Sequence, residues 1–527
     1  MASADYVIVG GGVNGLVAAA ILGKKGRKVL LLDRNARVGG CLRSEEITAP
    51  GFVHDVMATT LVLFLTSPAY GAVGPDLEKR GFAVAHSDLP TGVLRPDGSH
   101  VLFSRDRARN IATFEALAKG DGAAFSGEMD QMGADAPFLF SLLGGQLWSA
   151  RMAMTIAREA WKRGPRALAA WFGEALRPSR SYLEATYASE AIHALWAPWG
   201  LHCGLNPESA YSAAMIKVIA FAVELAGCPI AVGGAITLVS AFERLIADQG
   251  GEIRCDADIE RVETGTDGRA QAVRLASGER IEAARGVICS MTPTQLYGRL
   301  LRDHPAAAGV KTSLARYRYG KGDMQIHYAL DAPPKWKSGA DLGKVALLHV
   351  TPGLDGVSRA ANECERGLLP AEPTICVGQP TALDPSRAPE GKAILWLQLP
   401  EAPRLLKGDA KGEIETPADG AWTEAVREAY ADRVEALVAP HIEDFGGHVV
   451  ARKAYSPADL EAMNVNLVGG DPYGGSCGVD QFFLWRPFAE STNHTTPVPG
   501  LYHIGASTHP GPGLGGGSGF LLANTLK

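Results

Sequence analysis

The sequence predicts an α/β fold, and three features along the chain lead to this prediction. A short apolar strand near the N-terminus is followed at once by a glycine loop and a helix. A block of short strands with hairpin signals lies between residues 252 and 288. A final strand and a glycine-rich turn lie close to the C-terminus. We therefore expect an α/β domain that is assembled from separated segments of the chain.

The bulk composition is that of an ordinary globular protein. The 527 residues leave room for two or three domains, and 46% of them are hydrophobic, enough for a large core. The net charge of −6 excludes the strongly basic surface that is typical of nucleic-acid binders. We expect no nucleic-acid partner.

The chain carries no obvious targeting or membrane-spanning segment. Only five residues precede the first apolar run, and they include Asp5 but no Lys or Arg, unlike a signal peptide. No apolar stretch reaches the roughly 18 residues that a membrane span needs. None of the 8 cysteines forms a C-x-x-C pair, which favours free thiols in a reducing compartment. The sequence thus predicts a cytoplasmic protein.

The N-terminal elements form a βαβ start. Asp5–Val9 is short and β-branched, and it ends at a glycine, as a buried strand does. Asn14–Lys25 carries apolar residues suited to one packed helix face. Lys28–Leu32 reads as a second buried strand. Two strands joined by a crossover helix are expected to lie parallel.

The middle of the chain divides into a helical region and a strand-rich block. Residues 61–225 are predicted to be mostly helical, with long apolar faces over 150–175 and 207–227. Asp267-Gly268 and Ser277-Gly278 are hairpin signals. The predicted strands around them are Glu252–Cys255, Ile259–Thr264, Ala270–Leu275 and Arg280–Ile288.

The last third alternates strands, loops and helices. Thr423–Val438 is its clearest helix. Gly500–Gly505 is the last predicted strand, and a terminal helix is expected from about Gly519.

Gly10-x-Gly12-x-x-Gly15 lies between the first strand and the first helix, and its three glycines, Val13 and Asn14 are predicted cofactor contacts. Glycines at this spacing allow a tight turn, close approach of the backbone to a pyrophosphate, and close packing of helix on strand. The helix N-terminus offers free N–H groups to phosphates. Asp33, at the end of the second strand, is suited to hydrogen bonding with ribose hydroxyls. The pattern predicts a dinucleotide site.

A double glycine, Gly39-Gly40, follows six residues after Asp33. It lets the backbone pass close to a ligand, and a neighbouring arginine can pair with a pyrophosphate. A domain that binds only a nicotinamide nucleotide does not need this feature, so it favours FAD as the cofactor. The predicted cofactor contacts in this stretch are Arg34, Gly39, Gly40, Cys41 and Arg43.

The C-terminal segment 501–519 is the third glycine-rich feature. A helix N-terminus there can face the flavin edge on which negative charge builds up during reduction. The segment also fits G-x-G-x-x-G, but it opens the last helix and follows no strand directly, so we expect no second dinucleotide site. The predicted contacts are Gly505, Gly513, Gly515, Gly516 and Gly517.

Several stretches carry a resemblance to a known family: residues 7–43, the motif Glu45-Glu46-x-x-x-Pro50-Gly51-Phe52, and Leu501-Tyr502 through Gly511, with further similarity over 250–293 and 467–487. The chain resembles the phytoene desaturase-type flavoproteins, and especially the branch of pyridine nucleotide-disulphide oxidoreductase domain-containing protein 2. The resemblance implies a Rossmann-like FAD-binding domain from residues 1–60, 226–300 and 490–527. It also implies a mixed α+β substrate domain from 61–225 and 301–489. Within the FAD-binding domain, Ile259 matches the position whose backbone contacts the adenine.

The chain departs from this family at two positions. Many relatives have Arg directly after the double glycine, where this chain has Cys41, so that Arg37 or Arg43 would serve the pyrophosphate instead. The branch often has His where this chain has Gly474, which points to a different substrate.

Candidate reacting groups each have a structural alternative. His509, in the C-terminal turn, is the predicted catalytic residue that orients substrate or moves a proton, or else it packs locally. Cys477 is either a covalent flavin link, as in some amine oxidases, or a buried thiol. Lys321 either approaches the flavin, as a lysine does in amine oxidases, or is solvated. His202, Trp196 and Trp199 are expected to border the substrate cavity, or to fill the core.

The segment 151–180 carries Arg and Lys among apolar side chains. A basic amphipathic helix of this kind can lie on an anionic membrane surface, which would suit a lipophilic substrate. A solvated helix face is the alternative.

The predicted reaction removes two electrons from a C–C, C–N or C–O bond of a fairly apolar small molecule, with hydride transfer to flavin N5. We expect reoxidation by oxygen, a quinone or a carrier protein, and no metal. A flavin amine oxidase that releases peroxide is one alternative. A non-redox flavoprotein, either an isomerase or a binding module, is the other.

Overall fold

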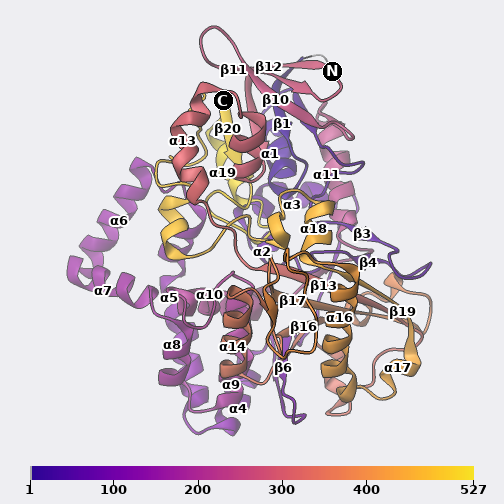
Figure 1. The fold of residues 1–527 in the computed structure, drawn as a ribbon. Coiled ribbons are helices and arrows are strands. Elements are labelled where there is room, and N and C mark those ends of the chain that lie inside the picture. Colours follow the sequence, from indigo (N-terminus) through magenta and orange to yellow (C-terminus); the bar gives the residue numbers. More distant parts are fainter. Residues whose placement is uncertain (1–2) are drawn as a thin grey trace.

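Two seven-stranded sheets organise the protein, and the computed structural model describes residues 3–527 (Figure 1). The first sheet has the order β10-β11-β12-β1-β2-β9, with β20 also pairing with β12. Its strands are β1 (Ser3–Val9), β2 (Val29–Leu32), β9 (Glu252–Arg254), β10 (Ile259–Thr264), β11 (Ala270–Leu275), β12 (Arg280–Ser290) and β20 (Leu501–Ile504). The N-terminal, middle and C-terminal segments thus share one sheet, as expected for a domain that is assembled from separated segments.

The parallel part of this sheet is built from buried apolar strands. β1 pairs in parallel with β2 and β12, and β12 pairs in parallel with β20. All four residues of β2 are buried, which is typical of a strand covered on both faces. β10, β11 and β12 are antiparallel, and their turns contain the predicted Asp267-Gly268 and Ser277-Gly278 pairs. Both hairpin predictions are confirmed.

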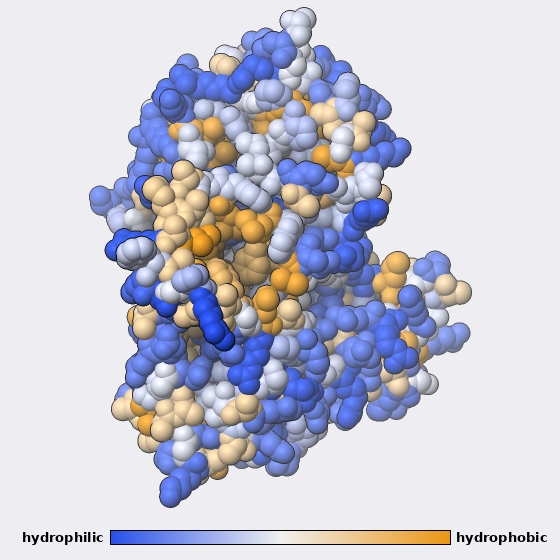
Figure 2. Space-filling view, turned by 90° about the vertical axis from the view of Figure 1, so that its left-hand side faces the viewer, coloured by the Kyte–Doolittle hydropathy of each residue, from blue (hydrophilic) through white to orange (hydrophobic). Residues whose placement is uncertain are grey.

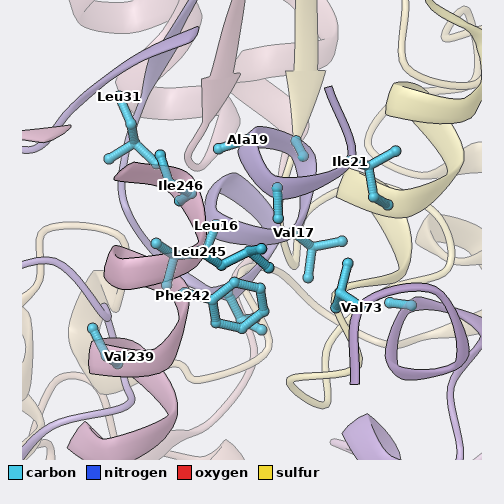
Figure 3. Close-up of a cluster of buried hydrophobic side chains, with 14 of the residues drawn as sticks. Leu16, Val17, Ala19, Ile21, Leu31, Val73, Val239, Phe242, Leu245 and Ile246 are labelled. Carbon is cyan, nitrogen blue, oxygen red and sulfur yellow. The ribbon is translucent and has the colours of Figure 1, made fainter. Parts of the chain in front are cut away.

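Helix α1 (Val13–Lys24) packs between the first sheet and two further helices, α3 (Pro68–Glu78) and α11 (Ile236–Asp248). Figure 3 shows Leu16 and Val17 of α1 beside Val73 of α3 and Phe242 of α11. The residues from Val13 to Leu22 are almost all buried, because helices and sheet surround α1. This packing fixes the position of the glycine loop at its N-terminus.

The second sheet has the order β19-β13-β17-β16-β14-β6-β7 and lies below the first in Figure 1. It is antiparallel except for the pair β14 and β6. The region predicted to be mostly helical contributes two of its strands. Its strands are β6 (Thr91–Leu94), β7 (His100–Phe103), β13 (Gly322–Leu330), β14 (Leu347–Val350), β16 (Ile375–Gly378), β17 (Ala393–Ala402) and β19 (Val449–Tyr455).

The two faces of the second sheet differ in character. Met324, Ile326 and Tyr328 of β13 belong to an apolar core with residues of α16 (Glu424–Val438). Side chains alternate along a strand, so Asp323 and Gln325 face the opposite way. Every residue of β13 is buried, and polar side chains on the second face are therefore enclosed.

Helices between residues 107 and 226 cover the second face or project from the molecule. α6 and α7 extend to the left of Figure 1. The predicted helical segment 150–175 is divided at Gly164 (φ 87°), which separates them. No described helix is long and apolar enough to cross a membrane. The helices are α4 (Arg107–Leu117), α5 (Asp121–Gly144), α6 (Ala150–Arg163), α7 (Pro165–Ala175), α8 (Ser179–Thr186), α9 (Glu190–Leu201) and α10 (Ser212–Ala226).

Candidate functional site

A cavity of about 430 Å³ joins the two sheets. At one end it reaches the carboxyl ends of the parallel strands, through Val9, Leu32 and Ser290. This is where nucleotides bind in open α/β sheets. The other end is lined by residues of α9, α10, β13, β14 and β17. Many of the predicted cofactor contacts line the first end: Gly10, Gly12, Val13, Asn14, Asp33, Arg34, Gly40, Cys41, Ile259, Gly505, Gly513 and Gly515.

The N-terminal glycine loop fits a dinucleotide phosphate. A Cβ on Gly15 would lie 2.1 Å from the carbonyl oxygen of Gly10, so only glycine permits this close packing of helix and loop. A Cβ on Gly12 would meet nothing within 4 Å, which leaves open space at the cavity wall. Gly12 is the N-cap of α1 and gives no side-chain cap, so the first N–H groups of the helix remain available to an anion.

Asp33 lies in the cavity wall with both carboxylate oxygens held by the backbone. Its Oδ2 accepts a hydrogen bond from the Gly11 N–H (2.8 Å), and its Oδ1 accepts one from the Asn35 N–H (2.9 Å). Burial raises the pKa of Asp33, and the N–H groups of Asn35 and Gly11 oppose that effect. A carboxylate has about four lone-pair positions, so further acceptor capacity remains for ribose hydroxyls.

The C-terminal helix α19 (Gly517–Thr525) packs directly against α1. The Ser518 hydroxyl donates to Asn14 Oδ1 (2.8 Å), and the Gly505 N–H donates to Ser518 Oγ (2.8 Å). A Cβ on Gly519 would lie 2.0 Å from the carbonyl oxygen of Asn14. α19 also begins without a side-chain cap. Two uncapped helix N-termini from opposite ends of the chain therefore lie side by side near this cavity.

Some predicted cofactor contacts lie just outside the cavity wall. Gly15, Gly39, Gly516 and Gly517 are not lining residues. The Gly39 N–H donates to the carbonyl oxygen of Gly11 (2.8 Å), so it supports the loop. Arg43 is also absent from the wall and forms an ion pair with Glu45.

His509 does not line the cavity, although the next residue, Pro510, does. Its carbonyl oxygen accepts a hydrogen bond from His494 Nε2 (2.8 Å). Burial, and then the charge of His494, lower the pKa of His509 to about 3. The imidazole is therefore neutral at ordinary pH, and it lies behind the wall.

Three of the remaining candidates, Cys477, Lys321 and Trp196, do not line the cavity. Burial raises the pKa of Cys477 to about 11. Lys321 Nζ donates to Asn206 Oδ1 (2.6 Å). Trp196 packs in the core, with its ring centroid 5.0 Å from that of Phe103.

Trp199 and His202 do line the cavity, as predicted for a substrate border. Trp199 Nε1 is buried without a hydrogen-bond partner. His202 Nε2 lies 2.8 Å from His349 Nε2, and with Cys376 these groups place three potential metal-ligand atoms within 4.8 Å of one another. Burial lowers the pKa of both histidines, so one neutral imidazole donates to the other. That hydrogen bond accounts for their close approach.

Sequence reasoning missed a polar group on the second sheet. Asp323 and Gln325 of β13, with Trp396 and Gln398 of β17, line the far end of the cavity. Asp323 Oδ2 accepts hydrogen bonds from the side-chain amides of Gln325 and Gln398, each 2.8 Å long. Polar residues at every second position of otherwise apolar strands were a signal for this group.

An apolar wall completes the cavity. It comes mainly from α10, through Met215, Val218, Ile219, Ala222 and Val223. On the side of the molecule from which α6 and α7 project, apolar side chains gather around a hollow (Figure 2). The site thus combines a nucleotide cradle, an apolar wall and one enclosed polar group.

Comparisons with known proteins agree with this geometry. Residues 8–72 match the NAD(P)-binding Rossmann-like domain family. The chain is 25% identical to pyridine nucleotide-disulfide oxidoreductase domain-containing protein 2 of Mus musculus, over 99% of this chain and 93% of that protein. It is 28% identical to a zeta-carotene-forming phytoene desaturase of Myxococcus xanthus, over 96% and 90%.

A third relative is one of the subunits of limonene dehydrogenase from Castellaniella defragrans, 25% identical over 99% of this chain and 94% of that protein. Among solved structures, an oxidoreductase from Methanosarcina mazei has a TM-score of 0.63 at 15% identity, covering 99% of this chain and all of that one. The structural likeness supports the fold, and the sequence relatives extend over the whole chain.

Proposed function

We propose that this chain, a full-length relative of the phytoene desaturases and an FAD-dependent oxidoreductase, acts as a desaturase-like dehydrogenase or oxidase on a fairly apolar small molecule. One observation carries the proposal: a single cavity runs from the nucleotide cradle of α1 to the apolar wall of α10. When bound, FAD would supply the acceptor for one hydride, which carries the two electrons. Oxygen, a quinone or a carrier protein would then take up the electrons.

The cradle residues hold and orient the cofactor. The free N–H groups at the start of α1 would bind the phosphates, and Asp33 would accept hydrogen bonds from the ribose hydroxyls. The start of α19 would offer the positive end of a helix dipole to the ring of FAD, where it would stabilise negative charge. These contacts use backbone groups, which a folded chain presents without reorganisation.

The α10 wall binds the substrate and excludes water. Its side chains offer apolar contact and no competing hydrogen bonds, which favours lipophilic molecules. The relatives named for phytoene and limonene, both hydrocarbons, support this choice of substrate class.

We also propose that α6 rests on an anionic membrane surface. Trp161 is 93% exposed and Met154 65% exposed, and Arg158 and Lys162 lie beside them. Exposed aromatic and basic side chains on one helix suit an interface between headgroups and acyl chains. Sedimentation with anionic vesicles should therefore fall several-fold in Trp161→Ser, while vesicles of neutral lipid should bind neither protein. Equal sedimentation of wild type and Trp161→Ser would mean that α6 does not bind the membrane and is a solvated helix.

The absorption spectrum of the purified protein tests the cofactor assignment. We expect a flavin spectrum, and FAD released into solution by acid precipitation. Anaerobic addition of phytoene, limonene and a panel of apolar alcohols and amines should then bleach the flavin with at least one compound. A colourless protein that cannot be loaded with FAD would refute the proposal.

A further inference from the structure

Asp323 occupies an unusual place in the cavity. It is 4% exposed, lies near the start of strand β13, and lines the part of the cavity that the second sheet forms. Its neighbours along the wall are Trp396 and Gln398 of β17. A carboxyl group is seldom buried without a partner, because burial disfavours its charged form.

The hydrogen bonds of Asp323 are one-sided. Oδ2 accepts from the amides of Gln325 and Gln398, but Oδ1 is buried and has no hydrogen-bond partner. Gln325 is itself fixed by the indole N–H of Trp396. The carboxyl group is thus held firmly by one oxygen, while the other is enclosed and lacks a hydrogen-bond partner among the described residues. An unsatisfied buried acceptor in a native site calls for a ligand or a catalytic role.

We propose that Asp323 is the base that accepts the substrate proton, an assignment that rests on the proposed function. The substrate carbon loses a hydride, with both electrons of its C–H bond, to the bound FAD. The neighbouring carbon, nitrogen or oxygen atom loses its proton to the carboxylate of Asp323. The electron pair left on that atom forms the new double bond, so the substrate loses two electrons and two hydrogens.

The surroundings of Asp323 make it a stronger base than an ordinary carboxylate. Burial raises its pKa to about 8, against the lowering effect of the Gln398 and Gln325 amides, and the charge of Glu401 adds to the rise. Other titratable groups facing it are Cys41, Cys376 and Tyr473, none of them cationic. The charge of Lys321 acts on Glu401, whose pKa it lowers, and is not among the main influences on Asp323.

The other candidates are weaker bases or are badly placed. Burial lowers the pKa of His202 to about 4, so its imidazole holds a proton poorly. His509 lies outside the cavity wall. A base works best when its pKa lies near the working pH, which favours Asp323.

The test compares Asp323→Asn with wild type in the FAD-loaded protein. The probe is whichever compound of the panel bleaches the wild-type flavin without oxygen. We expect bleaching to slow by about 10²–10⁴-fold in Asp323→Asn. In wild type the rate should rise with pH through about 8, because the base must lose its proton first. The variant should lose this dependence, while both proteins are bleached equally by dithionite, which needs no base.

Glu401→Gln is the matched control. Glu401 is also a buried carboxyl group with a raised pKa, of about 7, but it does not line the cavity. This variant should keep its fast rate at high pH, with a slightly lower midpoint because a neighbouring negative charge is gone. Comparable slowing in Glu401→Gln would overturn the specific role of Asp323.

A second readout does not depend on turnover. Infrared difference spectra of the protein without FAD should show a protonated carboxyl band that disappears near pH 8 in wild type and Glu401→Gln, whereas Asp323→Asn should keep only the Glu401 band, which disappears near pH 7. A flavin that no compound reduces would defeat the proposed function itself. A substrate that bleaches Asp323→Asn at the wild-type rate and with the wild-type pH profile would defeat only the proton acceptor.

Discussion

The two ends of the cavity are built in different ways. The nucleotide end consists of backbone, with glycine turns and two uncapped helix N-termini around Gly12 and Gly516. The far end consists of side chains that antiparallel strands bring together, above all Asp323 and Gln398. The comparison teaches that the first end has no room for a Cβ at Gly15 or Gly519, whereas the second depends on which polar groups are paired. Substitutions at the two ends should therefore fail in different ways.

The largest effect is expected for Gly15→Ala. Its Cβ would lie 2.1 Å from the Gly10 carbonyl oxygen, a rigid backbone atom, so the loop and α1 must separate. We expect FAD to be lost on gel filtration and the unfolding free energy to fall by about 3 kcal/mol or more, by analogy with severe overpacking. Urea unfolding and flavin content measure the two effects.

Gly127→Ala is the matched control at an exposed position of α5, where a Cβ would meet nothing within 4 Å. Alanine is the better helix former by about 1 kcal/mol, so this variant should be slightly more stable and should keep its FAD. Retention of FAD by both variants would show that the glycine loop is not the cradle.

The far end should show the opposite behaviour, since Asp323→Asn removes function but not stability. The folded-state pKa of about 8 lies above the ordinary aspartate value near 4. The folded protein therefore binds more protons than the unfolded chain between these values, and its stability falls as pH rises through this window. Wild type should lose stability relative to Asp323→Asn by up to about 1.4 kcal/mol for each pH unit between 4 and 8.

Urea unfolding at pH 5 and pH 9 measures this difference. The variant should gain on wild type at pH 9, because it carries no charge to bury. A constant difference between the two proteins at both pH values would mean that Asp323 titrates normally.

The same contrast explains how much could be predicted from the sequence. The glycine spacing around Gly12 is a local pattern, so it indicated the strand, turn and helix directly. The parallel pairing of the first two strands could then be predicted from the helix that joins them. Asp323 and Gln398 lie 75 residues apart, and their meeting depends on the register that pairs β13 with β17. No local pattern encodes that register. The alternation Asp323-x-Gln325 in an enclosed strand was visible, but its burial was not.

His509 illustrates the opposite situation, in which a local pattern suggested a role that the cavity wall does not support directly. Its place in the C-terminal glycine segment made it the natural candidate for catalysis, yet it lies behind the cavity wall. Adjacent residues of a turn point in different directions, and Pro510 reaches the cavity where His509 does not. Its assignment stays a prediction, which His509→Ala can compare directly with Asp323→Asn.

A smaller effect is expected where the two ends of the chain meet. Asn14 Oδ1 accepts hydrogen bonds from the Ser518 hydroxyl (2.8 Å) and the Gly519 N–H (3.3 Å). Asn14→Ala would leave both donors without this partner at a buried contact, at a cost of about 1–3 kcal/mol. We expect FAD affinity to weaken about 5–100-fold by fluorescence titration. If the variant binds FAD with full affinity, the contact between α1 and α19 does not contribute to cofactor binding.

The smallest and most specific effect is expected for Gln398→Met. This change keeps the size of the side chain but removes one of the two amide donors to Asp323 Oδ2. The hydrogen bond favours the charged carboxylate, so its loss should raise the pKa of Asp323 further. The pH midpoint of substrate-dependent bleaching should then move up by about one pH unit, since such a bond contributes about 1.5 kcal/mol or more. FAD binding should not change, because the Gln398 side chain donates to Asp323 on the second sheet and not to the glycine loop of the first. A midpoint that moves down, or FAD loss without a change in midpoint, would mean that Gln398 supports the fold and not the carboxylate.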